Sequence, residues 1–288
     1  MSGLDEATIL AAYRAACAVE LAALKPGNVH AHAAGHGMTV ADFLTSAAVS
    51  APHVTAHGTA IGARILAAVE ATSAACGQNT NLGIVLLAAP LAAAAERAGD
   101  LQHSLDGVLA GLTRADAVLA YRAIRLAAPG GLGTSDRHDV ASEPTVTLLE
   151  AMRVAAGRDR IALQYATRFS DVLGLGVEQM QASRAGGWSD AWATSATYMA
   201  FLGRFTDSHV TRKHGDTTAA AVRDRAAPLT ARLLTAHNPA SLESDLLEFD
   251  AELKRAGINP GTSADLAVAS HLAADLLAAA RDEPSFAI

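Results

Sequence analysis

Apolar residues recur at helical spacing along almost the whole chain, and no segment shows the strict alternation that indicates a half-buried strand. Hydrophobic residues make up 51% of the 288 residues but aromatic residues only 4%, so alanine, leucine and valine supply most of the apolar volume. These residues favour closely packed helices, and alanine and leucine also favour the helix itself. We therefore expect an all-α protein with a single multi-helical domain over residues 1–288 and a core from about 5 to 280.

Proline, glycine and short polar side chains divide this pattern into separate helices. Thr39 is a good N-cap for the second helix, and Pro52 should end it because proline disrupts a helix interior. The expected helices cover residues 4–24, 40–50, 61–75, 82–98, 105–112, 114–127, 146–156, 160–173, 177–185, 188–205, 217–235, 242–256 and 264–280.

Composition argues against several classes of protein. The formal net charge of −7, with no basic block, argues against nucleic acid as a partner. Cys17 and Cys76 are isolated and fit a reducing compartment. The N-terminus lacks the pattern of a signal peptide, and charges or histidines interrupt every long apolar run. We expect a cytoplasmic protein that binds neither nucleic acid nor a membrane, and the sequence leaves open whether it forms a homodimer.

Five polar segments stand out because the rest of the chain is so apolar, and each lies at the end of an expected helix. An all-α fold can gather such ends into one active-site mouth, where Asp and Glu can bind Mg²⁺ and where Lys, Arg and His can bind phosphate. The segments are residues 25–30, 77–81, 135–139, 206–216 and 259–265.

The second polar segment directly precedes an apolar helical pattern. Its residues Asn79, Thr80 and Asn81 are all good N-caps. A helix N-terminus carries partial positive charge and presents free N–H groups, so it favours anions such as phosphate. The segment therefore predicts either an ordinary capped helix or an anion-binding end.

Other polar residues also have ordinary structural explanations. Glu20 and Asp42 could be solvated carboxylates on helix faces. His30 and His36 could be loop histidines, and with no thiol nearby their spacing matches no usual zinc site.

The same two interpretations apply toward the C-terminus. Asp207 could cap a helix whose last turn would favour the cations Arg212 and Lys213. Asp265 could be a first-turn acid of the last helix, favoured by the helix dipole, with Thr262 or Ser263 as the cap.

Four motifs together resemble the triphosphoribosyl-dephospho-coenzyme A synthase family over about residues 5–280. The resemblance implies an all-α fold and an enzyme that moves the triphosphoribosyl group of ATP to a ribose hydroxyl of dephospho-CoA and releases adenine. Members make the prosthetic-group precursor for the acyl carrier proteins of citrate lyase and malonate decarboxylase. The motifs are Lys25-Pro26-Gly27, Gly37-Met38-Thr39 with Asp42-Phe43 and Ser46, Gly77 with Asn79-Thr80, and Pro260-Gly261-Thr262-Ser263-Ala264-Asp265-Leu266.

Two segments differ from the family pattern. The family usually reads Lys-Pro-Gly-Leu-Val-Asp where this chain has Lys25-Pro26-Gly27-Asn28-Val29-His30. It usually reads Asn-Thr-His-Lys-Gly where this chain has Asn79-Thr80-Asn81-Leu82-Gly83. The chain looks more like a divergent branch found with methanopterin-type one-carbon metabolism. That coenzyme contains a ribose 5-phosphate joined to a ribitol hydroxyl, so an aryl-ribitol is the alternative acceptor to dephospho-CoA.

The implied reaction assigns tasks to the polar residues. Positive charge develops on the sugar as adenine leaves, so a carboxylate should lie close by. A general base takes the proton of the attacking hydroxyl, and Mg²⁺ with cationic side chains neutralises the triphosphate. Our catalytic candidates are Glu20, His30, His36, Asp42, Asp207 and His209. For ATP binding we expect Lys25, Asn28, Asn79, Thr80, Asn81, Arg212, Lys213, His214 and Ser263. The metal-binding candidates are Asp139, Asp207 and Asp265.

Two other functions remain open at this point. A helical metal-dependent phosphohydrolase could use His30, His138, Asp139 and Asp265 as ligands, and it would release phosphate without adenine. A non-catalytic nucleotide-binding regulator would leave ATP unchanged with every plausible acceptor.

Overall fold

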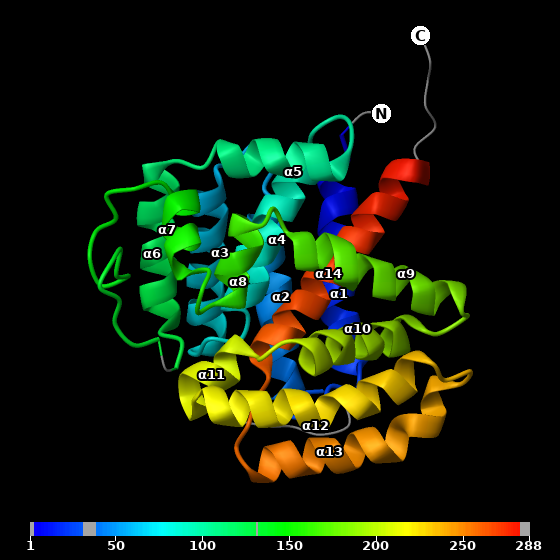
Figure 1. The fold of residues 1–288 in the computed structure, drawn as a ribbon. Helices are drawn as coiled ribbons and strands as arrows, with labels where there is room; N and C mark the ends of the chain where they lie inside the picture. Colours follow the sequence, from blue (N-terminus) through cyan, green and yellow to red (C-terminus); the bar gives the residue numbers. More distant parts are fainter. Residues whose placement is uncertain (1–2, 31–38, 131, 283–288) are drawn as a thin grey trace.

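The computed structural model describes residues 3–30, 39–130 and 132–282. Within these ranges the backbone forms α-helices, one π-helical turn and one 3-10 turn, but no β-strand (Figure 1). The all-α prediction is therefore confirmed. The α-helices are α1 Glu6–Ala22, α2 Val40–Val54, α3 Ile61–Cys76, α4 Leu82–Ala95, α5 Leu101–Ala110, α6 Arg114–Ala127, α7 Leu148–Ala155, α8 Arg160–Ala166, α9 Val177–Ala185, α10 Asp190–Arg204, α11 Ser208–His214, α12 Asp216–Leu234, α13 Glu243–Arg255 and α14 Gly261–Asp282. The π-helical turn is η1 Val172–Gly176 and the 3-10 turn is η2 Pro239–Leu242.

The last helix, α14, runs through the middle of the molecule (Figure 1). It packs against α1, α4 and α10, while α2, α3 and α6 form a second group beside α1 and α4. Helices α10, α12 and α13 form a layer at the bottom of Figure 1. The fold therefore brings the first and last helices of the described chain side by side.

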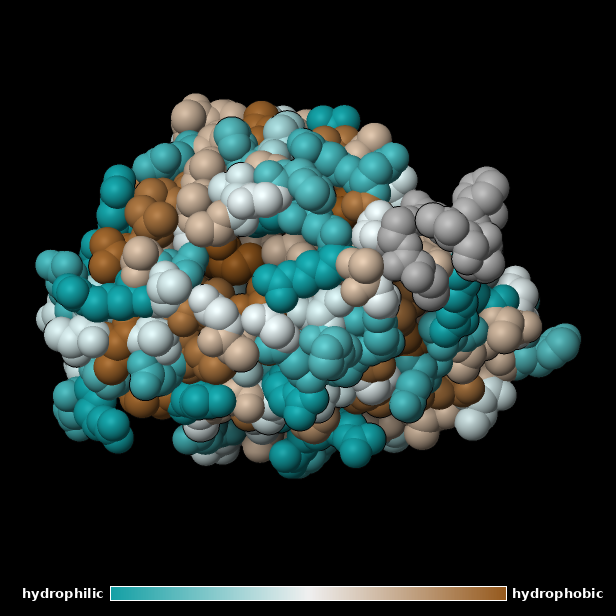
Figure 2. Space-filling view, turned by 90° about the horizontal axis from the view of Figure 1, so that it is seen from above, coloured by the Kyte–Doolittle hydropathy of each residue, from teal (hydrophilic) through white to brown (hydrophobic). Residues whose placement is uncertain are grey.

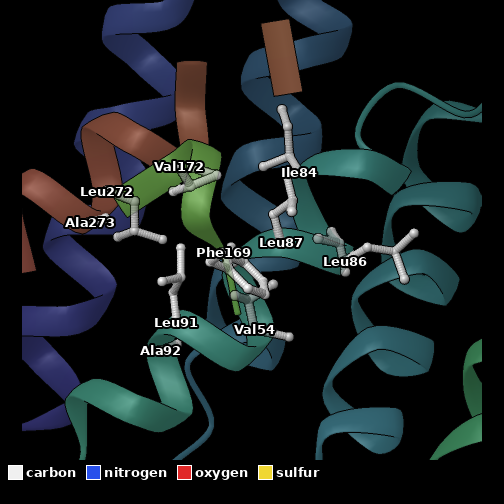
Figure 3. Close-up of a cluster of buried hydrophobic side chains, with 14 of the residues drawn as sticks. Val54, Ile84, Leu86, Leu87, Leu91, Ala92, Phe169, Val172, Leu272 and Ala273 are labelled. Atoms are coloured by element: carbon white, nitrogen blue, oxygen red, sulfur yellow. The ribbon is translucent and has the colours of Figure 1, made fainter. Parts of the chain in front are cut away.

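The larger hydrophobic core surrounds α4, which is buried on all sides. Figure 3 shows Leu87 and Leu91 of α4 against Phe169, Val172 and Leu272. A helix that is apolar all round must be covered all round, and α4 is covered by α1, α2, α3, α5, α8 and α14. A second cluster joins α10, α12 and α13. Since α4 is held so tightly, its N-terminal end has a fixed position.

Surface and length give two further findings. On the face shown in Figure 2, hydrophobic residues form scattered patches between hydrophilic ones. By length and composition alone, the stretch Gly261–Arg281 of α14 could cross a membrane, which the sequence did not lead us to expect. However, 67% of its most apolar window is buried inside the protein, as in a core helix.

Several helix ends differ from the prediction. Helix α2 continues through Pro52 to Val54, because one missing N–H near a C-terminus does not prevent a last turn. The expected helix 160–173 is interrupted, because Arg168 and Phe169 adopt positive φ angles of 59° and 60°. The polar segment 206–216 contains α11, which was not among the expected helices but which the capping explanation of Asp207 implied.

Candidate active site

One cavity of about 660 Å³ opens where the N-terminal ends of α4 and α14 meet α11. Its walls also include parts of α1, α6, α7 and α8 and of the segment between α6 and α7. Its lining contains a group of apolar residues and a group of polar residues, which we call the apolar side and the polar side. The apolar side includes Leu82, Ile84, Leu86, Ile124, Met152 and Ile161, and the polar side includes Glu20, Asn28, Asn79, Asn81, Asn259 and Asp265.

Asp265 is one of the polar residues that line the cavity. It lies so close to Gly83, in the first turn of α4, that a Cβ at Gly83 would overlap Oδ2. No described residue donates a hydrogen bond to this carboxylate. Burial raises the pKa of Asp265 well above its ordinary value, and the negative charges of Asp207 and Glu20 add to the rise, while Arg212 opposes it. Among the described residues, the Asp265 side chain in the cavity thus has neither a hydrogen-bond donor nor an ion-pair partner.

Lys25 is fully buried behind the polar side and does not line the cavity. It donates to Glu20 Oε1, to Asn28 Oδ1 at 2.9 Å and to the Val29 carbonyl at 2.7 Å. Burial lowers the pKa of Lys25, and the Glu20 charge opposes that effect. Its three N–H groups are all in use, so the structure places Lys25 as a support for Glu20 and Asn28 rather than as a phosphate ligand.

His30 is also buried outside the cavity. Its Nε2 lies 3.2 Å from Asp250 of α13 and 3.3 Å from Lys254 Nζ. Burial lowers the pKa of His30, which keeps the neutral ring favoured. This contact holds the segment after α1 against α13, so His30 does not reach the cavity as a general base. The other loop candidate, His36, lies outside the described residues.

Asp207 joins two helices instead of facing the cavity. Its Oδ1 accepts from the His209 and Val210 N–H groups as the N-cap of α11. Its Oδ2 accepts from the Ser263 backbone N–H at 2.7 Å and hydroxyl at 2.8 Å, in the first turn of α14. Burial raises the pKa of Asp207, against these four hydrogen bonds. The capping explanation of Asp207 is therefore the correct one, and Ser263 is its partner rather than an ATP ligand.

Helix α11 contributes four residues to the cavity lining: His209, Thr211, Arg212 and Lys213. His209 lies against Gly261, while Arg212 pairs with Asp159 at 2.6 Å. Lys213 is exposed at the mouth, with Cε close to Gly130. His214 in the same turn is exposed but does not line the cavity, because it lies on another side of the helix.

The segment before α4 lines the cavity as expected. Asn81 is the N-cap residue of α4 but its side chain makes no capping hydrogen bond, whereas Asn79 accepts from the Leu82 N–H at 3.1 Å. Asn81 Nδ2 lies 3.2 Å from Ser50 Oγ, and Thr80 pairs with Ser46. All three candidates from this segment face the cavity, but each already has one protein partner.

Asp42 is in a different position from the one that a catalytic role requires. It forms a capping box with Thr39 at the start of α2, with the Thr39 N–H 2.8 Å from Oδ2. These hydrogen bonds lower the pKa of Asp42. Asp42 does not line the cavity, although its neighbour Phe43 does.

The three metal candidates do not form one site. Asp139 lines the cavity and accepts from the Ser135 and Ala141 N–H groups, whereas Asp207 is used as described above. Among the described residues, no group of three His, Cys, Asp or Glu side chains could hold a metal ion. The ligand set of the alternative phosphohydrolase, which needs His30 and His138 together, is not assembled either.

Some cavity residues were not found from the sequence. They include Asn259, Tyr121, Arg137, Arg158 and Asp159. Arg137, Arg158 and Lys213 all line the cavity, and no carboxylate within the described ranges forms an ion pair with any of them. Arg158 donates to the Ser135 hydroxyl at 2.9 Å. In the sequence, the charged pair Arg158-Asp159 at the boundary between two expected helices could have indicated that these two residues belong to the site.

Comparisons with known proteins agree with this architecture. The chain is similar to a solved structure from Archaeoglobus fulgidus, described as a candidate triphosphoribosyl-dephospho-CoA synthase. The two share 25% identity and a TM-score of 0.62, over 80% of this chain and 97% of the other. No curated protein matches the sequence. The profile of the family ATP:dephospho-CoA triphosphoribosyl transferase (CitG) matches residues 6–284. The chain therefore belongs to the CitG family of triphosphoribosyl transferases.

Proposed function

We propose that this enzyme transfers the triphosphoribosyl group of ATP to an alcohol acceptor in the cavity and releases adenine. The observation that carries the proposal is a division of charge within one cavity. Three cations without an ion-pair partner among the described residues lie at the mouth, and the Asp265 carboxylate lies inside. A triphosphate suits the first feature, and a developing positive charge on a sugar suits the second.

Three cationic side chains support the proposal that the triphosphate binds at the mouth of the cavity: Arg137, Arg158 and Lys213. Each would gain a charge-assisted hydrogen bond to a phosphate oxygen, and none would have to break an ion pair to do so. Arg212 is less available, because Asp159 already holds it. The N-terminal ends of α4 and α14 add partial positive charge to the same cavity.

The chemical step breaks the bond between C1 of the ATP ribose and adenine and forms a bond from C1 to the acceptor oxygen. Asp265 would stabilise the positive charge on C1 in the transition state. The acceptor proton needs a base, for which Glu20 and His209 are the described candidates that line the cavity. The departing adenine takes up a proton in return.

Magnesium fits as a companion of ATP rather than as a resident ion. Mg²⁺ is usually bound by one or two carboxylates together with substrate phosphates. Asp265, with no hydrogen-bond donor of its own among the described residues, could supply one such ligand, and Glu20 a second. Bound there, the ion would neutralise charge on the triphosphate.

The acceptor is the finer part of the proposal. Leu82 is a buried residue of the cavity wall, at the position where the family usually has lysine. Leucine cannot bind a phosphate, whereas the apolar side formed with Ile84 and Leu86 suits an aromatic group. These features favour an aryl-ribitol of the methanopterin pathway over dephospho-CoA.

Parallel incubations test both parts. The enzyme is given ATP and Mg²⁺ with dephospho-CoA, with aryl-ribitols or with no acceptor, and adenine is followed by chromatography. We expect adenine release that depends on an acceptor and is faster with the aryl-ribitol. Release with dephospho-CoA alone would contradict the acceptor assignment, and no release with any acceptor would contradict the proposed transfer.

A further inference from the structure

Four side chains from three parts of the chain form one hydrogen-bonded row, which we call the relay: Glu20, Lys25, Asn28 and Asn259. Lys25 donates to Glu20 Oε1 and to Asn28 Oδ1, and Asn28 Nδ2 donates to Asn259 Oδ1 at 2.8 Å. The relay residues are at most 8% exposed. All except Lys25 line the cavity. The relay is therefore a buried polar wall with one open side.

The chemistry of Lys25 gives the relay a single polarity. An ammonium group has protons but no lone pair, so Asn28 must turn its oxygen toward Lys25. The NH₂ group of Asn28 then points to Asn259, which must accept with its own oxygen. The NH₂ group of Asn259 is left for the cavity, as is Oε2 of Glu20. Neither atom has a hydrogen-bond partner in the described part of the chain, and neither is sealed from the cavity.

A ligand that pairs with both atoms must offer a hydrogen-bond donor to Glu20 and an acceptor to Asn259. The carboxylate oxygen can only accept and the amide nitrogen can only donate. Phosphate would be repelled by Glu20, and an apolar group would leave buried polar atoms without partners. A vicinal diol satisfies both, since one hydroxyl can donate to Glu20 while the other accepts from Asn259.

We propose that the relay binds a vicinal diol, such as the 2′- and 3′-hydroxyls of a ribose. The inference rests on the proposed function, in which ribose hydroxyls of the donor, or hydroxyls of the acceptor, enter this cavity. Lys25 is a positioning residue: it touches no substrate but sets which end of each amide faces the cavity.

Two variants reverse the polarity with little change of shape. Asn259→Asp keeps an oxygen for Asn28 but replaces the donor with an acceptor. Glu20→Gln keeps an oxygen for Lys25 but places an NH₂ group toward the cavity. The matched control is Asn238→Asp, because Asn238 is exposed and its side chain already accepts from the Ala240 N–H. Circular dichroism and melting temperature establish that each variant is folded.

The measurement is calorimetric binding of ATP, 2′-deoxy-ATP and 3′-deoxy-ATP without acceptor. If the donor supplies the diol, wild type should bind ATP about tenfold more tightly than at least one deoxy analogue. In Asn259→Asp and Glu20→Gln this ratio should fall below about threefold, while Asn238→Asp keeps it. If the acceptor supplies the diol, the three nucleotides bind alike, and the preference appears between an acceptor and its monodeoxy form.

Equal binding of diol and deoxy forms by wild type, for donor and acceptor alike, would overturn the inference. So would a preference that survives in both relay variants. The proposed transfer fails separately: a wild type that prefers diols but releases no adenine contradicts the transfer and supports the diol site. Adenine release without any diol preference supports the transfer and contradicts the diol site.

Discussion

The carboxylate of Asp265 occupies the space that a side chain on Gly83 would need, so the first turns of α14 and α4 meet at this point. Replacing Gly83 with alanine would push the carboxylate away from the sugar. A displacement of this kind can reduce catalysis by about a hundredfold, even when binding is little affected. We therefore expect Gly83→Ala to lower kcat far more than it raises KM for ATP. Steady-state kinetics measure this effect. The control is Gly157→Ala, because a Cβ at Gly157 would meet no atom within 4 Å. Gly99 is unsuitable as a control because its φ of 110° disfavours alanine. Unchanged kcat in Gly83→Ala would show that the position of Asp265 does not matter.

Asp265→Asn should stabilise the protein while it abolishes transfer. Burial raises the pKa of Asp265, so ionisation disfavours the folded state. This cost is absent below the ordinary pKa of 3.8 and grows as pH rises through the folded-state pKa. The variant should therefore gain about 0.5–2 kcal/mol over wild type at neutral pH, and the gain should shrink toward acid. Urea unfolding in chelator across pH measures it, and a gain that is independent of pH would argue against this cause.

Asp207→Ala should have the opposite effect. It removes the acceptor for four hydrogen bonds that join α11 to α14, which should cost about 2–4 kcal/mol. Activity per folded molecule should decline only as far as α11 loosens. A variant with normal stability and no activity would indicate that Asp207 has a catalytic role.

Lys213→Ala and Arg158→Ala should each weaken ATP binding by about 1.5–3 kcal/mol, the range for a hydrogen bond to a charged group. Added salt should reduce the difference, because both residues lie at an open mouth. The matched control is Arg232→Ala, an exposed arginine on α12 that does not line the cavity. If all three variants bind ATP like wild type, the mouth does not hold the triphosphate.

Chelation should weaken ATP binding if Mg²⁺ enters with the nucleotide. Calorimetry with and without a chelator measures the effect, and Asp265→Asn should make it smaller because one carboxylate ligand is lost. Binding that is indifferent to Mg²⁺ in wild type would remove the metal from the proposed scheme.

The sequence predicted the helices well where local signals agree with packing. Helices α6 and α9 have the predicted bounds, and Thr39 caps α2 as expected. It failed at Arg168 and Phe169, where tertiary packing imposes a left-handed backbone on residues that do not favour one. The local sequence contains no signal that tertiary packing will change the backbone conformation here.

The candidate site was predicted as a set of segments but not as a set of roles. Segments 77–81 and 259–265 do line one cavity. Sequence could not show which polar side chains face inward. Lys25 was therefore assigned to ATP binding, and Asp207 to catalytic and metal-binding roles, although the hydrogen bonds of both are used within the protein. Arg158 was missed because it does not stand out locally, and Asn259 was given no role although it lies in segment 259–265. Their importance comes from neighbours far away in the sequence.

Helix α14 carries Asp265 in its first turn and packs between α1, α4 and α10. During synthesis the ribosome therefore makes the mouth, the apolar side of the cavity and all four relay residues before the carboxylate on which transfer would depend. A nascent chain that ends before residue 261 could begin to fold but could not consume ATP. In the proposed scheme, transfer would therefore become possible only after α14 has been synthesised and has packed against α1, α4 and α10.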